Sequence, residues 1–589
     1  MTLFKDKANL IWEVADLLRG DYKQSDYGKV ILPLTVLRRL DSILAPTKQN
    51  VLAYLPKVAQ SSDRIKDITL NKIAGFNFHN RSQFDFAKLI ADPNQIAANL
   101  RNHINGYSAS AREIIEYFNF DDQIERMDDP KADILYQVVK SFSEIDLASL
   151  DSMQMGYMFE NLIRRFAEQS NETAGEHFTP REVIKLMVNL LFNADSQALT
   201  QAGIVKTLYD PACGTGGMLS IGEQHLTAFN PNAKLQVFGQ EINPESYAIC
   251  KSDMLIKGQN PSNIKFGNTF PVDGLRGEKF DYMLSNPPFG VSWKKAAKII
   301  KEEHANLGFA GRFGAGLPRI NDGSLLFLLH MISKMKPPQD GGSRIGIVFN
   351  GSPLFTGRAG SGESNIRQWI IENDWLEAII ALPDQLFYNT GIATYIWILN
   401  NHKSSQRRGK IQLINATGDT FWEKMPRSLG NKRKQIAENG ETKGIGLISK
   451  LYGDFVENKF VKILPNPFFG YWRVTVEQPL LMENGELKLD KKGQPKPDSK
   501  LRDYENIPFL QKDGNDRLIP QTIEAYFARE VLPHLPTAWI DEAKTKTGYE
   551  INFTKYFYEF KPLRSLTEIR ADILALEASS LALEKEALG

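Results

Sequence analysis

The segment richest in chemistry is Asn286-Pro287-Pro288-Phe289, which directly follows the apolar run Phe280–Ser285. Two successive prolines remove amide donors and stiffen the backbone, so a strand must end there. The Asn286 side-chain oxygen and the Pro287 carbonyl can then each accept one hydrogen bond from an exocyclic NH₂ group. Holding both protons directs the nitrogen lone pair toward a methyl electrophile. Phe289 offers a face on which a flipped base can stack.

A glycine-rich turn is the second candidate site, with the sequence Asp210-Pro211-Ala212-Cys213-Gly214-Thr215-Gly216-Gly217. It follows an apolar run and precedes a helical stretch, MLSIGEQHL. Glycines let the backbone turn sharply and approach a ligand, and the following helix points amide groups at that ligand. Taken alone, such a turn also fits a phosphate loop or a structural turn. The Gly-Lys-Ser/Thr signature of a phosphate loop is missing, however.

An acidic residue, Glu241, follows the next apolar run. A carboxylate at the end of the second strand of a nucleotide-binding sheet can accept hydrogen bonds from ribose hydroxyls. The alternative is a solvated loop acid. Because the turn, the acid and Asn-Pro-Pro-Phe all stand at strand ends, their coincidence favours one ligand site over unrelated structural turns.

The elements that must position these residues alternate between residues 150 and about 400. Helical stretches separate six apolar runs, at Val205–Tyr209, Leu235–Gln240, Phe280–Ser285, Arg344–Asn350, Leu376–Leu382 and Tyr395–Asn400. Continuous apolar runs of this kind predict a parallel α/β sheet covered by helices on both faces. Ligands of such sheets bind outside the carboxyl ends of the strands, where the three candidate segments lie.

We expect three parts, at residues 1–150, 151–402 and 403–589. The first is helical by its three- and four-residue apolar spacing, with Pro33 and Pro46 interrupting or ending helices. The third begins with a basic stretch that is either a solvated face or a DNA-backbone contact. The basic residues of this stretch are Arg407, Arg408, Lys410, Lys424, Arg427, Lys432, Arg433 and Lys434.

The last 25 or so residues predict a helix. Leu566, Ile569, Ile573, Leu576 and Leu583 fall near a heptad seam. This seam suits packing against the helices of a partner, and docking onto the chain's own domain is the alternative.

Composition bounds the class of protein. The 589 residues carry a formal net charge of +1, which argues against a strongly basic protein that grips DNA by charge alone. The two cysteines, Cys213 and Cys250, have no metal-ligand or disulfide spacing, so we expect no metal and a reducing, cytoplasmic compartment. The N-terminal segment lacks the features of a signal peptide, and the longest apolar runs are too short to span a bilayer. No integral membrane role is expected.

Together these motifs resemble those of the amino-methyltransferases that act on adenine N6. A third motif, residues 175–181 (GEHFTPR), precedes the glycine-rich turn, and this order is that of the γ group of DNA amino-methyltransferases. Across nearly its whole length the sequence resembles the modification subunit of type I restriction–modification systems. The stretches that carry this wider likeness are YGKVILPLTVLRRLDSIL, SLGNKRKQI and YFYEFKPLRSLTEIRADILALE.

The resemblance implies an S-adenosylmethionine-dependent, Rossmann-like α/β domain, with a helical N-terminal domain and a mostly helical C-terminal region. It assigns Asn286, Pro287, Pro288 and Phe289 to the target base. It also implies contacts to S-adenosylmethionine from Gly175, Glu176, His177, Phe178, Thr179, Pro180, Asp210, Gly214, Thr215, Gly216, Gly217, Glu241 and Asn268.

Two of these assignments have alternatives. Asn268 stands where the family often has Asp, which keeps an acceptor oxygen but removes a charge. His177 has the alternative role of shaping its loop. No general base is required, because the sulfonium is already an activated electrophile.

The implied partners are double-stranded DNA with a flipped adenine, one specificity subunit for two copies of this chain, and a motor-nuclease subunit for restriction. Methylation of RNA or of protein glutamine is the nearest alternative, but those enzymes usually show Asn-Pro-Pro-Tyr and lack the large helical N-terminus. A restriction–methylation fusion would need nuclease or helicase motifs, and we find no convincing set. An inactive scaffold that binds DNA or a partner is the remaining alternative, which the intact motifs argue against.

Overall fold

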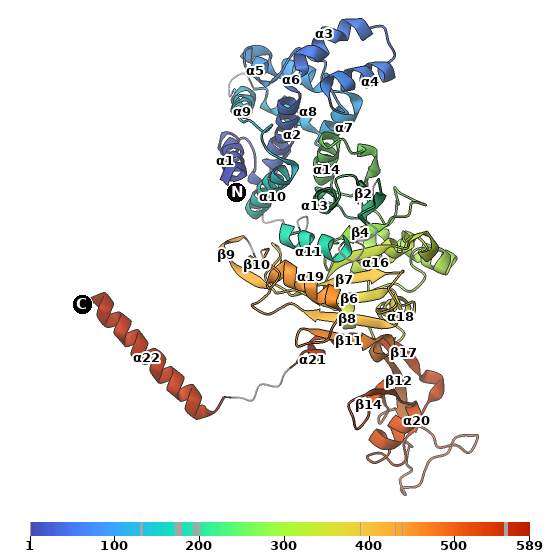
Figure 1. The fold of residues 1–589 in the computed structure, drawn as a ribbon. Helices are drawn as coiled ribbons and strands as arrows, with labels where there is room; N and C mark the ends of the chain where they lie inside the picture. Colours follow the sequence, from blue (N-terminus) through green and yellow to red (C-terminus); the bar gives the residue numbers. More distant parts are fainter. Residues whose placement is uncertain are drawn as a thin grey trace. The chain divides into compact units, whose positions relative to one another are not determined.

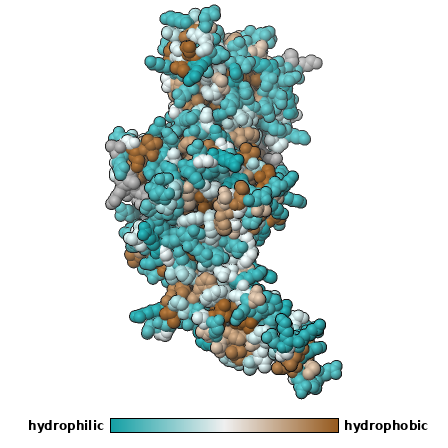
Figure 2. Space-filling model, turned by 90° about the vertical axis from the view of Figure 1, so that its right-hand side faces the viewer, coloured by the Kyte–Doolittle hydropathy of each residue, from teal (hydrophilic) through white to brown (hydrophobic). Residues whose placement is uncertain are grey.

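The chain forms two compact units, residues 1–551 and 552–589, each of which is described by itself (Figure 1). The computed structural model describes residues 2–129, 133–170, 179–192, 199–201, 203–388, 390–429, 431–438, 440–558 and 564–588. None of the described helices is long and apolar enough to cross a membrane. The face of the molecule seen in Figure 2 is largely hydrophilic, with separate hydrophobic patches.

The N-terminal part is helical, as predicted. Its helices are α1 (Thr2–Leu17), α2 (Gly28–Leu44), α3 (Lys48–Val58), α4 (Asp63–Ala74), α5 (Phe86–Leu89), α6 (Ile96–Asn105), α7 (Ala109–Glu116), α8 (Phe120–Met127), α9 (Ile134–Ser143) and α10 (Ser152–Ser170). Pro46 lies just beyond the end of α2, as expected, but Pro33 lies inside that helix without ending it. The core of these helices includes Ala248, Ile249 and Leu255, so the following domain shares it.

A mixed sheet forms the centre of the first unit (Figure 1). In spatial order its strands are β11 (Val461–Pro465), β8 (Lys410–Asn415), β6 (Leu376–Ala381), β7 (Thr394–Asn400), β5 (Arg344–Asn350), β4 (Tyr282–Ser285), β1 (Val205–Asp210), β2 (Lys234–Glu241) and β3 (Ile264–Phe266). All six strands predicted from the sequence are present. The strands from β5 to β3 are parallel, whereas β7 runs antiparallel to both β5 and β6. The prediction of a parallel sheet is therefore wrong at β7, because no helix is described between β6 and β7 (residues 382–393) that could carry the chain back for parallel pairing.

Helices cover both faces of this sheet. They are α11 (Arg181–Phe192), α13 (Gly217–Phe229), α14 (Pro244–Ile256), α15 (Ala297–Leu307), α16 (Ser324–Ser333), α17 (Ser352–Phe355), α18 (Gly362–Glu372) and α19 (Gly444–Asp454). Side chains alternate along β1: Leu208 packs against α13, and Tyr209 on the other face hydrogen-bonds to His330 of α16, with 3.0 Å between Oη and Nε2. The two faces are thus packed separately.

The sheet continues past residue 402, where we placed the end of the domain. Both β8 and β11 come later in the chain, and β8 pairs in parallel with β6. The apolar residues of β8, Ile411, Leu413 and Ile414, are fully buried. The basic composition around them obscured this short strand in the sequence.

Residues 470–549 form a second, antiparallel sheet, so the expectation of a mostly helical C-terminal region fails there. Its strands are β12 (Gly470–Glu477), β13 (Asp503–Pro508), β16 (Trp539–Ile540) and β17 (Lys546–Tyr549). Smaller elements are the hairpins β9 (Trp422–Leu429) with β10 (Lys432–Ile436) and β14 (Leu510–Lys512) with β15 (Leu518–Pro520), and the helix α20 (Ile523–Tyr526). The second unit holds α21 (Phe553–Tyr556) and α22 (Leu566–Leu588), the latter at the predicted C-terminal helix.

A buried ionic cluster joins the ends of three strands. The Glu377 carboxylate of β6 accepts hydrogen bonds from Arg344 of β5 (3.0 Å), from Asn400 of β7 (2.8 Å) and from the Tyr452 hydroxyl of α19. Burial opposes the ionisation of Glu377, but Arg344 and Arg407 and the hydrogen bonds outweigh it and lower its pKa to about 2. The ionised carboxylate therefore stabilises the folded chain.

Replacement of Glu377 tests this cluster. Glu377→Gln should lower the free energy of unfolding by about 3–5 kcal/mol, because it removes the charge opposite a buried guanidinium. Since the folded pKa lies below the ordinary value, the stabilisation is complete above about pH 5 and is lost as the pH falls toward 2. Urea denaturation across this range should show a shallower acid dependence in the variant. The exposed Glu441→Gln is the control, and an equal loss in both variants would contradict this role.

Candidate functional site

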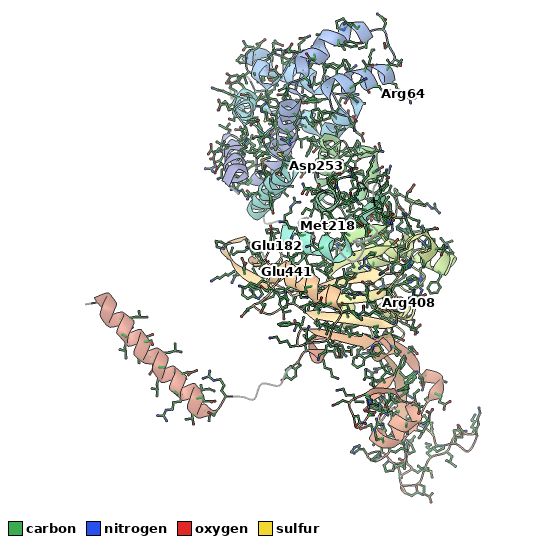
Figure 3. The ribbon with its side chains drawn as sticks, viewed as in Figure 1. Arg64, Glu182, Met218, Asp253, Arg408 and Glu441 are labelled. Atoms are coloured by element: carbon green, nitrogen blue, oxygen red, sulfur yellow. The ribbon has the colours of Figure 1, made fainter. Side chains whose placement is uncertain are left out.

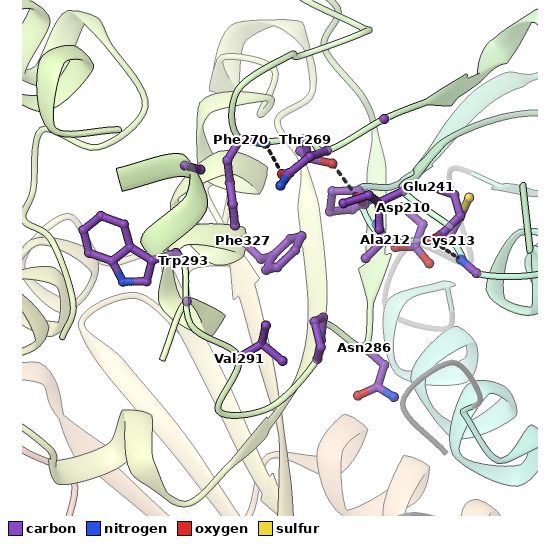
Figure 4. Close-up of a pocket in the computed structure, with 18 of the residues that line it drawn as sticks. Asp210, Ala212, Cys213, Glu241, Thr269, Phe270, Asn286, Val291, Trp293 and Phe327 are labelled. Atoms are coloured by element: carbon purple, nitrogen blue, oxygen red, sulfur yellow. Dashed lines mark hydrogen bonds between the residues drawn. The ribbon is translucent and has the colours of Figure 1, made fainter. Parts of the chain in front are cut away.

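The three candidate segments meet at one edge of the central sheet. Asp210, Glu241 and Asn286 stand at the carboxyl ends of β1, β2 and β4, which are neighbours in the order β4-β1-β2. A cavity of about 830 Å³ opens beside them (Figure 4). The motifs predicted separately from the sequence therefore contribute to a single site.

The glycine-rich turn is held by close packing. Gly214 and Gly216 have left-handed backbone angles, with φ of 53° and 84°, and α13 begins at the residue after Gly216. A Cβ atom on Gly216 would lie 2.7 Å from the Sγ of Cys250. This turn is therefore confined to glycine both by its conformation and by its neighbour.

The Glu241 carboxylate fixes the turn to the second strand. Its Oε2 accepts a hydrogen bond from the Gly214 amide at 2.8 Å, and its Oε1 accepts one from the Asn243 amide at 2.7 Å. Glu241 is buried and lines the cavity. Each oxygen retains a second lone pair for a ligand hydroxyl.

Asp210 is a buried carboxyl at the floor of the site. Desolvation raises its pKa to about 7, although hydrogen bonds from the Ala212 amide (3.0 Å) and the Ser285 hydroxyl (2.9 Å) act in the opposite direction. A cationic group bound in the cavity would favour its ionised form.

Asn286 presents an acceptor oxygen at the base motif. Its Nδ2 donates a hydrogen bond to Thr179 Oγ1 at 3.0 Å, and its Oδ1 is buried with no hydrogen-bond partner among the described residues. A buried acceptor without a partner costs free energy, so its presence beside a cavity points to a ligand donor. Pro288 also lines the cavity.

Apolar side chains from two elements complete the cavity. Phe270 follows β3 and Phe327 lies on α16, with 4.6 Å between their ring centroids. Asn268 accepts a hydrogen bond from the Phe270 amide, and Thr269 donates one to the Pro211 carbonyl (Figure 4). The Asn268 oxygen predicted to contact a ligand therefore supports its own loop.

The structure places most of the remaining predicted residues. Thr179, Thr215 and Gly217 line the cavity, and the Pro180 carbonyl accepts the first hydrogen bonds of α11. Four further predicted residues, Gly175, Glu176, His177 and Phe178, lie outside the described residues. Pro287, which precedes Pro288 in the chain, is buried.

Phe289 is placed away from the cavity lining. Its half-buried ring packs against Phe387, with 6.3 Å between the ring centroids. Its role in stacking a base stays a prediction.

Several residues that line the cavity were not predicted from the sequence. Thr269 and Phe270 directly follow Asn268, and a run of lining residues directly follows Asn-Pro-Pro-Phe-Gly, so proximity to the motifs was the available signal. Phe327 lies in an apolar helix with no local signal of function. The lining residues not predicted include Cys213, Ile242, Thr269, Phe270, Val291, Trp293, Lys294, Lys295 and Phe327.

Comparison with known protein families gives two matches. The N-6 DNA Methylase model matches residues 151–443, and the HsdM N-terminal domain model matches residues 7–142. The chain is 26% identical over 438 residues to the type I restriction enzyme MjaIX methylase subunit of Methanocaldococcus jannaschii, covering 69% of this chain and 72% of that protein. It is 29% identical over 266 residues to the HindI methylase subunit of Haemophilus influenzae, covering 44% and 54%. Other curated relatives are matched over about half of their length.

The fold is similar to a solved structure. It is the crystal structure of the type I restriction-modification system methyltransferase subunit from Streptococcus thermophilus, with a TM-score of 0.61 at 22% identity. The match covers 79% of this chain and 96% of that one.

The glycine-rich turn can be tested by adding one methyl group. Gly216→Ala should cost about 1–3 kcal/mol of stability through its left-handed backbone alone. Displacement of Cys250 should also distort the cavity. Since the sequence resemblance implies S-adenosylmethionine as the ligand, we expect weaker binding of its analogue S-adenosylhomocysteine, measured by calorimetry. Gly418→Ala is the matched control, since its Cβ would meet nothing within 4 Å. Wild-type ligand affinity in Gly216→Ala would remove the turn from the site.

Proposed function

Because this chain belongs to the N-6 DNA methylase family, and is thereby a DNA adenine methyltransferase, we propose that its cavity brings a methyl donor and one extruded adenine together at the ends of β1, β2 and β4. We propose further that it works as the modification subunit of a type I system. The methylase-subunit relatives and the HsdM N-terminal domain support this proposal.

The observation that carries the proposal is the buried Oδ1 of Asn286, which has no hydrogen-bond partner in the described part of the chain. The Nδ2 of Asn286 donates its hydrogen bond to Thr179. In this proposal the Oδ1 atom accepts a hydrogen bond from one proton of the adenine amine. The Pro287 carbonyl accepts the second proton in this proposal. Two acceptors in fixed positions would orient the amine toward the cavity. Holding the two reactants in this geometry lowers the activation barrier of methyl transfer.

The chemistry of the cavity fits S-adenosylmethionine. Bound there, this cofactor supplies an activated methyl group. We assign Glu241 to the ribose hydroxyls and the glycine-rich turn to close backbone approach. Phe270 and Phe327 offer apolar faces for the adenine ring of the cofactor. Asp210, whose pKa is raised to about 7 by burial, provides a carboxylate that a nearby cation would stabilise.

Asn286→Ala separates chemistry from cofactor binding. It removes one preorganised acceptor, a loss that typically costs a factor of about 10² to 10³ in rate. Methyl transfer should fall by this factor, while calorimetry should show unchanged affinity for S-adenosylhomocysteine. Asn484→Ala, in an exposed loop, is the matched control. A wild-type methylation rate in Asn286→Ala would contradict the assignment of this residue.

We also propose that α22 joins a helical bundle with a specificity subunit, of which one serves two copies of this chain. Its seam residues are exposed apolar side chains, from 40% for Ile569 to 86% for Leu566. The next two seam residues along the helix, Ile573 and Leu576, are 52% and 69% exposed. Such a stripe is suited to knobs-into-holes packing with partner helices.

Removal of α22 tests this assembly. A chain ending at Tyr558 should remain folded and bind S-adenosylhomocysteine, because the cavity lies wholly within the first unit. It should no longer co-purify with the specificity subunit, and site-specific methylation should be lost for that reason. Unimpaired co-purification would refute the interface. Simultaneous loss of folding and cofactor binding would favour docking of α22 on the chain itself.

A further inference from the structure

A row of lysines leads away from the cavity along α15. Lys294 and Lys295 line the cavity, in the short helix Lys294–Ala296 that continues into α15. Lys298 and Lys301 follow on α15, and all four side chains are exposed. Lys294, Lys298 and Lys301 are separated by four and three residues, which places them on one face of the helix. We call these three residues the lysine face.

The charges of the lysine face are available to a ligand. Within the described part of the chain, no ion pair involves Lys294, Lys298 or Lys301. The helix also carries two acids. Glu303 forms an ion pair with Arg312 at 2.6 Å, and the exposed Glu302 forms no ion pair with the lysine face in the described structure. Lysine side chains held on one helix face, beside a cavity for a base, suit a polyanion.

Both ends of this segment are fixed. At its start, the Trp293 indole donates a hydrogen bond to the Arg319 carbonyl at 2.9 Å, and the side chain is 5% exposed. Farther along, Glu303 binds Arg312, whose guanidinium also donates to the carbonyls of Thr269 (2.9 Å) and Phe270 (2.7 Å). Arg312 thereby ties the helix to the cavity wall, so a group bound on α15 keeps a defined position relative to the cavity.

The basic stretch at 403–434 is less available. Lys432 is buried and ion-paired with Glu182 of α11, which Figure 3 labels. Lys434 pairs with Asp384, and Arg407 donates to Gln412 at 3.0 Å. Arg408 donates to a backbone carbonyl at 3.2 Å. Much of this charge holds the chain's own fold together, which leaves α15 as the stronger candidate for an external anion.

We infer that the lysine face holds backbone phosphates of the DNA strand that delivers adenine to the cavity. The inference rests on the proposed function and adds to it a surface that positions the substrate. Phosphate contacts fix the register of a duplex without reading its sequence, as this chain requires if a specificity subunit reads the site. Because Arg312 holds α15 against the cavity wall, a phosphate on the lysine face would fix the distance between the strand and the methyl donor.

The test compares two triple variants of the full-length chain. One carries Lys294→Gln, Lys298→Gln and Lys301→Gln; the control carries Lys488→Gln, Lys492→Gln and Lys496→Gln, which remove the same charge from an exposed loop. Binding to a fluorescent duplex is measured over a range of salt concentrations, and S-adenosylhomocysteine is titrated into the same samples. A plot of the logarithm of the DNA association constant against the logarithm of the salt concentration has a negative slope. Loss of three phosphate contacts should reduce the magnitude of this slope by about 2–3. The slope and the ligand affinity of the control should stay at the wild-type value. Because Lys294 lines the cavity, unchanged ligand affinity is required of the single Lys298→Gln change, which lies outside the lining.

Other outcomes overturn the inference. A wild-type slope in the first triple variant, or an equal fall in both, would show that the lysine face does not contact phosphate. Wild-type chain that neither binds nor methylates DNA when its specificity subunit is present would refute the proposed function itself, which is a distinguishable failure. If the triple variant does not fold, the single Lys298→Gln change should lower the slope by about 1, and an unchanged slope there is equally decisive.

Discussion

The hydrogen bond from the Gly214 amide to the Glu241 carboxylate is the contact on which the site depends. It joins the turn after β1 to the end of β2, over 2.8 Å between buried atoms. The left-handed backbone of Gly214 directs its amide toward the Glu241 carboxylate. The close packing of Gly216 against Cys250 fixes the path of the turn. Asp210 and Asn286 then take their places because β1 and β4 are neighbours.

The same local order explains why three candidate segments could be recognised from the sequence. The glycine-rich turn, Glu241 and Asn-Pro-Pro-Phe each stand at the end of an apolar run, so the strand ends and the candidate residues were recognised together. The structure adds the strand order β4-β1-β2, which brings these strand ends side by side. Asn286 was assigned from the chemistry of its side chain and from the resemblance to adenine N6 methyltransferases, and its role stays a prediction. Its Oδ1 is buried and has no hydrogen-bond partner among the described residues.

What the sequence left open depends on contacts between distant segments. Phe327 reaches the cavity from α16, and β8 extends the sheet from a stretch whose composition is basic. Lys432 is buried against Glu182, which is 250 residues away in the chain. Neither the periodicity of apolar residues nor the spacing of motifs predicts such contacts, because they form only when distant elements pack together. The antiparallel course of β7 and the β-strands of residues 470–549 were missed for the same reason.

The central claim is that this site transfers methyl groups to the N6 amine of adenine in DNA. The most direct measurement incubates duplex DNA with the chain, its specificity subunit and S-adenosylmethionine carrying a labelled methyl group, then digests the DNA to nucleosides. We expect the label to be recovered as N6-methyladenine, and Asn286→Ala to abolish most of it. Label recovered in methylated cytosine, or in no nucleoside while the cofactor binds normally, would contradict the account.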